Sequence, residues 1–143
     1  MPASTGDDTA AVLQAAASEW RGWESARQTI ARAQCRAGIA GTCAPRPAVA
    51  QWSAELLDRA NVRVFASAIG VRVVAGSAVP SCGSTSAPQY RARARVRFVT
   101  ADSAVVTVEI RCQPARVELR AYAVRRVDCS SWVARETASL TSG

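Results

Sequence analysis

A strict two-residue alternation between residues 89 and 99 is the feature that most constrains the fold. Arginine occupies every second position from 91 to 97, and the positions between them carry Ala or Val. Successive side chains of a β-strand point to opposite faces of a sheet. The segment therefore predicts a strand that presents four guanidinium groups on one face and small or apolar side chains on the other.

Two further strands are predicted at 104–112 and 116–127, where apolar residues again recur at every second position. This pattern is typical of an antiparallel sheet with one apolar face and one charged face, covered on one side only. The residues expected to point inward are Val106, Val108, Ile110, Cys112, Val117, Leu119, Ala121 and Ala123.

The charged face can be paired across the three strands, because unlike charges opposite one another stabilise a sheet. A three-residue loop at 101–103 places Arg95 opposite Glu109. A two-residue turn at Pro114 and Ala115 places Glu109 opposite Arg120. Seven outward arginines then form a candidate anion-binding surface. They are Arg91, Arg93, Arg95, Arg97, Arg111, Arg116 and Arg120.

The first part of the chain has helical periodicity. A helix is expected from residue 9 to about residue 33, since it contains no proline and its apolar residues fall mostly three or four apart. A loop rich in Gly and Pro follows at 36–47, and a second helix is predicted at 48–60, with Val49, Trp52 and Leu56 on its inner side. The stripe of the first helix comprises Val12, Ala16, Trp20, Trp23 and Ile30.

A β-rich stretch is expected at 62–74 and a surface loop at 76–88. We therefore predict a polar tail (1–8), one α+β domain (9–129) and a C-terminal tail (130–143). The domain has two N-terminal helices packed on one face of a curved antiparallel sheet of four to five strands. Its element order resembles the cystatin-like or nuclear-transport-factor-two-like folds and the pilin headgroup. That resemblance implies a fold found in envelope and secretion-complex domains, and assigns no site residue.

Five cysteines leave two interpretations open. Cys35 and Cys43 bracket a flexible loop that a disulfide could close, which makes them the disulfide candidates. Alternatively, all five are small apolar residues in a reducing compartment. No pair has the C-x-x-C spacing, and the chain contains no histidine, so we expect no metal site.

Composition argues against catalysis. All 18 basic residues are arginine and histidine is absent, which removes the commonest general base and every Ser–His or Cys–His nucleophile. Glu109 and Glu118 are better explained as arginine partners, and no phosphate-binding glycine motif is present. We expect no enzymatic activity and no cofactor.

The remaining function classes are binding classes. We expect a structural or assembly module that contacts another protein or a second copy of itself. The alternative is a binder of nucleic acid or another polyanion, because the formal net charge is +7 and arginine binds phosphate bidentately. The first ten residues are polar and acidic, unlike a secretory signal peptide, and no apolar run is long enough to span a membrane. The compartment stays open, since a preceding segment could have been removed.

Overall fold

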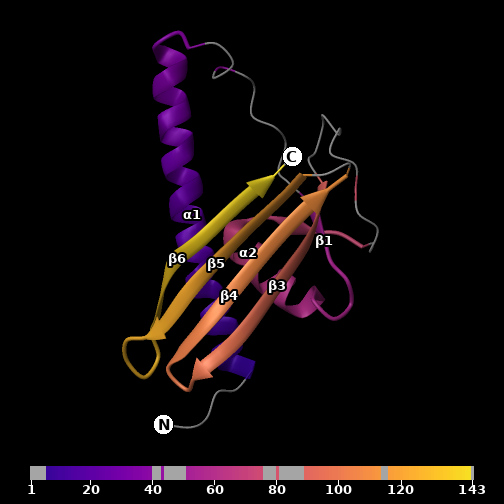
Figure 1. Ribbon diagram of the computed structural model, residues 1–143, viewed down its shortest axis with the longest axis vertical. Coiled ribbons are helices and arrows are strands. Elements are labelled where there is room, and N and C mark those ends of the chain that lie inside the picture. Colours follow the sequence, from indigo (N-terminus) through magenta and orange to yellow (C-terminus); the bar gives the residue numbers. More distant parts are fainter. Residues whose placement is uncertain are drawn as a thin grey trace.

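The computed structural model describes residues 6–39, 43, 51–75, 80, 89–113 and 116–142. It is an α+β structure in which two helices pack against a six-stranded, mostly antiparallel sheet (Figure 1). In chain order the elements are α1 (Gly6–Arg36), β1 (Gln51–Ser53), α2 (Arg59–Ile69), β2 (Arg72–Val73), β3 (Gln89–Thr100), β4 (Ser103–Cys112), β5 (Arg116–Arg126) and β6 (Trp132–Ser142).

The sheet has the strand order β2-β1-β3-β4-β5-β6. The short strands β1 and β2 are parallel to each other, and β1 is parallel to β3, whereas β3 to β6 form an antiparallel meander. The prediction of an antiparallel sheet with four to five strands thus agrees only roughly with a six-stranded, mostly antiparallel sheet. It missed β1 and β6, whereas β2 lies at the end of the segment predicted to be β-rich.

The core lies between α1, α2 and one face of the sheet, which we call the inner face. Trp20 of α1, Trp52 of β1 and Phe65 of α2 form an aromatic cluster with ring centroids 5.6–6.1 Å apart. All three are buried, as are Val106 and Val108 of β4. The predicted inner stripe of the first helix holds as far as Trp20, whereas Ile30 is 58% exposed.

The second helix does not lie where the periodicity placed it. Trp52 belongs to a strand, Leu56 is 77% exposed, and Val49 lies outside the described residues. The helix begins instead at Arg59 and buries Val62 and Phe65, within the segment predicted to be β-rich. Their spacing of three residues fits one face of a helix as well as an interrupted strand, so tertiary packing decides between them.

Both helices end at a glycine in the left-handed conformation. Gly38 has φ +81° and Gly70 has φ +75°. The amides of Gly38 and Ile39 bond the carbonyls of Cys35 and Gln34, and α2 ends in the same pattern. These bonds satisfy carbonyls that the last turn leaves unpaired.

The strand β5 runs in the predicted direction, but its side chains face the opposite sides of the sheet from the predicted ones. The structure pairs Cys112 with Arg116, so three residues separate the paired positions instead of two. Glu109 therefore lies opposite Leu119, and Arg120 turns to the inner face. A one-residue slip exchanges the two faces of a strand, which is why the expected inward set of β5 points outward.

The pairing of β3 with β4 differs by two residues from the prediction and so keeps the faces unchanged. Arg93, not Arg95, lies opposite Glu109, because the turn is shorter and a bulge separates Phe98 from Thr100. The predicted turn at Pro114 and Ala115 lies outside the described residues.

The segment expected as a C-terminal tail contains β6, which completes the sheet beside β5. The N-terminal half of α1 crosses behind the sheet, and its C-terminal half stands beyond the β6 edge (Figure 1). Among the described residues, no helix is long and apolar enough to cross a membrane.

Candidate functional site

The outer face of the sheet, the one turned away from the helices, carries five of the seven predicted arginines. Arg91, Arg93, Arg95 and Arg97 line β3, and Arg111 lies on β4 opposite Arg91. Between them on β3, the inward Ala92 and Ala94 are buried in the core. This part of the predicted site is therefore one continuous surface.

Acidic residues next to α2 pair with these arginines. Arg91 forms an ion pair with Glu55, and the Nε atoms of Arg93 and Arg95 lie 3.7 and 3.6 Å from the carboxylate oxygens of Asp58. Asp58 is only 6% exposed and immediately precedes α2, yet its side chain makes no cap hydrogen bond. Its carboxylate is instead directed to the two arginines of β3.

These side chains surround a cavity of about 250 Å³ on the outer face. Three arginines and three carboxylates contribute to its wall, so its formal charges balance. This arrangement suits a partner that offers both signs of charge. The lining residues are Glu55, Asp58, Arg91, Ala92, Arg93, Glu109 and Arg111.

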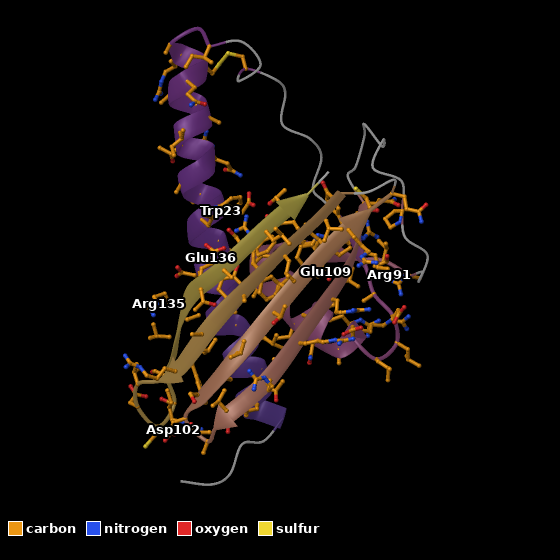
Figure 2. All side chains as sticks on the ribbon, in the orientation of Figure 1. Trp23, Arg91, Asp102, Glu109, Arg135 and Glu136 are labelled. Atoms are coloured by element: carbon orange, nitrogen blue, oxygen red, sulfur yellow. A yellow bond between two sulfur atoms is a disulfide. The ribbon has the colours of Figure 1, made fainter. Side chains whose placement is uncertain are left out.

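Arg111 and Arg97 complete the β3–β4 part of the outer face. Arg111 is held by Glu109 two residues earlier on the same strand, with nitrogen-to-oxygen distances of 2.8 and 3.0 Å. Arg97 forms no ion pair with any side chain that the structure describes. Figure 2 shows Arg91 and Glu109 on the β3–β4 side of the sheet.

A part of the outer face of β5 and β6 is apolar, and the exposed Arg125 and Arg135 border it on the same face. The register places Leu119 opposite Leu140 and Ala121 opposite Ala138. We call this surface the apolar band, and Leu140 is 59% exposed within it. Its residues are Val117, Leu119, Ala121, Ala123, Ala138 and Leu140.

Arg120, predicted for the anion-binding surface, lies instead on the inner face and is 2% exposed. Its Nη2 lies 2.6 Å from Glu118 Oε1, and its Nε lies 3.9 Å from Glu136. Its guanidinium carbon is 3.3 Å from the Trp23 ring centroid and 4.4 Å from that of Trp20. This buried group cannot meet an external anion. Arg116 begins β5, and its side chain is outside the described set.

A buried tyrosine adjoins this group. Burial raises the pKa of Tyr122 well above its ordinary value, and the nearby Arg120 charge only partly opposes that rise. Tyr122 Oη, Arg120 Nη1 and Glu136 Oε1 find no hydrogen-bond partner among the described residues. Sequence reasoning missed this inner cluster because it assigned Arg120 and Glu118 to the opposite face.

Arg126 connects three parts of the chain. It pairs with Asp8 of α1 at 3.4 Å and with Asp102 of the β3–β4 turn at 3.1 Å. Its guanidinium lies 4.6 Å from the Trp132 ring centroid. These contacts hold the first turn of α1 against the two hairpin turns, which is a structural role.

The cysteines that the structure describes include disulfide-bonded residues and one free thiol. Cys35 and Cys43 are joined at the far end of α1 (Figure 2), and Cys112 is also disulfide-bonded. Cys129 is a free, exposed thiol in the β5–β6 turn. No cluster of three metal-ligating side chains occurs within the described ranges.

Comparison with protein-family models, with curated proteins and with solved structures found no significant match.

Proposed function

We propose that this chain is a non-enzymatic binding or assembly module that acts through protein–protein contacts of its outer sheet face. The observation that carries the proposal is the division of that face. The apolar band covers part of β5 and the second half of β6, with Arg125 and Arg135 at its border, and ion-paired arginines cover β3 and part of β4. An apolar centre beside a polar, charged border is the usual anatomy of a protein interface.

The exposure of the apolar band supports this assignment. Leu140 is 59% exposed, and the small residues Ala123 and Ala138 of the same band are exposed as well. Scattered apolar side chains are normal on a surface, but contiguous ones mark interaction sites. Burying such a surface against a partner contributes roughly 25 cal/mol for each Å² removed from water.

The pairing of the arginines favours a protein over a polyanion. A nucleic acid would have to displace Glu55, Asp58 and Glu109 from the arginines that they contact. A protein surface carrying both charge signs could instead meet the arginines and the carboxylates together. The balanced wall of the 250 Å³ cavity fits that second kind of partner.

Site-specific photocrosslinking tests the proposal. A benzophenone amino acid replaces Leu140 in the apolar band, in the cells that express the chain. The matched control carries the same replacement at Leu57, which is 94% exposed next to α2. We expect a discrete crosslinked polypeptide from position 140 and not from position 57. An Ala138→Asp change in the same chain should abolish that crosslink.

Equal crosslinking from both positions, or none from either, would overturn the proposal. A crosslink that persists unchanged with Ala138→Asp would do so as well, because it would not depend on the apolar band.

A further inference from the structure

The strand β6 forms one edge of the sheet, and it is long. It runs for 11 residues, and within the part of the chain that the structure describes it pairs with β5 alone. In an antiparallel strand, alternate residues direct their N–H and C=O groups away from the paired neighbour. Such an edge can accept another strand along its length. The opposite edge, β2, has two residues and offers no comparable template.

The second half of β6 lacks the charged residues and prolines that block edge pairing in other proteins, and the bulge that interrupts its pairing with β5 lies at its start, at Thr137. Residues 137–142 contain no charged residue and no proline, in a chain where 20% of residues are charged. Every side chain from Thr137 to Thr141 is exposed. Soluble proteins usually protect such edges with charges, prolines or a covering segment. Here the chemistry of the edge favours pairing.

The position of α1 points to the same place. Its N-terminal half contacts β3 to β6 on the inner face, and Trp23 marks where it reaches the β6 side (Figure 2). Beyond that point its C-terminal half stands past the edge of the sheet (Figure 1). A strand added to β6 would widen the sheet on the side where the helix already extends.

A second copy of the chain can pair with this edge without electrostatic repulsion, because the second half of β6 carries no charged side chain. The formal net charge of +7 disfavours self-association through most of the surface. Pairing residues 137–141 with the same residues of another copy, with Ser142 opposite Glu136, brings no like charges together. In an antiparallel arrangement with its two-fold axis at Ser139, Ala138 lies opposite Leu140 of the second copy. Both belong to the apolar band, so the two bands become one surface.

We propose that two copies of this chain pair antiparallel through the edge of β6 that faces away from β5, around a two-fold axis at Ser139. The inference rests on the proposed function, because it names the partner of the assembly module. It implies a continuous sheet through both copies, with the apolar bands adjacent across the axis.

Sedimentation of the full chain over a wide range of concentration tests the pairing. We expect twice the monomer mass at high concentration. Ser139→Arg places two like charges directly opposite each other at the axis, which should weaken dimerisation by about fivefold. Ser67→Arg is the matched control, because Ser67 is an exposed serine on α2 and receives the same added charge. It should leave the dimer unchanged.

A covalent trap locates the axis. In a Cys129→Ser background, oxidation of Ser139→Cys should link two copies, because directly paired strand residues lie about 4.5–5.5 Å apart between Cα atoms, within disulfide range. Ser67→Cys should give no such link.

Two results would overturn the inference. One is a monomer at every concentration, and the other is a dimer that Ser139→Arg leaves intact. If the chain is monomeric but position 140 crosslinks to a different polypeptide, the edge pairing is wrong and the proposed function stands. If neither the dimer nor a crosslink from position 140 occurs, both are wrong.

Discussion

Two Glu-x-Arg segments on adjacent strands show how differently the same pair of residues can be used. Glu109 and Arg111 lie on the outer face of β4, and Glu118 and Arg120 lie on the inner face of β5. In both, the arginine contacts the glutamate two residues earlier, at 2.8 Å in β4 and 2.6 Å in β5. The Arg111 side chain is 44% exposed, whereas that of Arg120 is 3% exposed.

The difference teaches that burial and ring contacts, not the ion pair itself, decide what such a segment contributes. An exposed pair is screened by water and contributes about 0–1 kcal/mol. A buried pair has lost its hydration, and removing one partner leaves an uncompensated charge in the core. Arg120 also lies against two tryptophan rings, which an exposed arginine of the outer face does not.

The largest expected effect comes from breaking each pair in the same way. Arg120→Met should lower the free energy of unfolding by roughly 3 kcal/mol or more, because Glu118 and Glu136 lose their partner inside the protein. Arg111→Met, the matched change, should cost less than about 1 kcal/mol. Urea unfolding of the two variants measures both values, and equal losses would contradict the comparison.

The ring contact can be isolated by a double-mutant cycle. Arg120→Met and Trp23→Leu, separately and together, should give a coupling energy of about 1–2 kcal/mol, the range for a desolvated cation–π contact. The same cycle with Arg111→Met in place of Arg120→Met should give no coupling. A coupling near zero in both cycles would remove the ring contact from the explanation.

Tyr122 extends the comparison to pH. Its folded-state pKa is raised by burial, so its contribution to stability is complete below the ordinary tyrosine pKa of about 10 and is lost as pH rises above it. Each pH unit in that window should lower the free energy of unfolding by about 1.4 kcal/mol. Tyr122→Phe should flatten this loss in unfolding curves measured at alkaline pH. An unchanged slope would show that another group causes the loss.

The smallest expected effect concerns the outer face. Glu109→Gln frees Arg111 without uncovering a buried charge, so stability should change by no more than about 0.5 kcal/mol. Heparin binding at low salt should increase by about twofold, because one competitor for the guanidinium is lost.

Changing Arg91 and Arg97 to Gln should weaken heparin binding at low salt and flatten its salt dependence, because fewer counterions are released on binding. Heparin binding that none of these changes alters would exclude the arginine surface as a polyanion site.

Much of the fold follows from the local pattern of apolar and polar residues. The errors lie where contacts between residues far apart in the sequence decide the structure. The first helix and the faces of β3 and β4 were predictable, because their periodicity extends over many residues. The short strand β1 was not, since its three residues are held by parallel pairing to β2 and β3, far away in sequence. The helix α2 is likewise fixed by packing of Phe65 against Trp20 and Trp52.

The candidate site was predictable only in part for the same reason. Arg91, Arg93 and Arg95 alternate with core alanines, so the face of β3 on which they lie could be predicted from the sequence. For β5, the odd-numbered residues look more apolar than Glu118 and Arg120 and were assigned to the core. The inward side chains of Tyr122 and Val124 were the signal for the actual register. Asp58 gave no sequence signal, because its arginine partners lie on a strand far along the chain.

The overhanging half of α1 has a consequence for how the protein opens in solution. Helical segments this short are marginal in water without tertiary packing. Amide hydrogens from about Ser25 to Arg36 should therefore exchange with solvent much faster than those around Val12 and Ala16, which are fully buried. The disulfide between Cys35 and Cys43 ties the fast-exchanging end to the chain that follows, so a protease that cuts between these two cysteines would release no fragment until the bond is reduced.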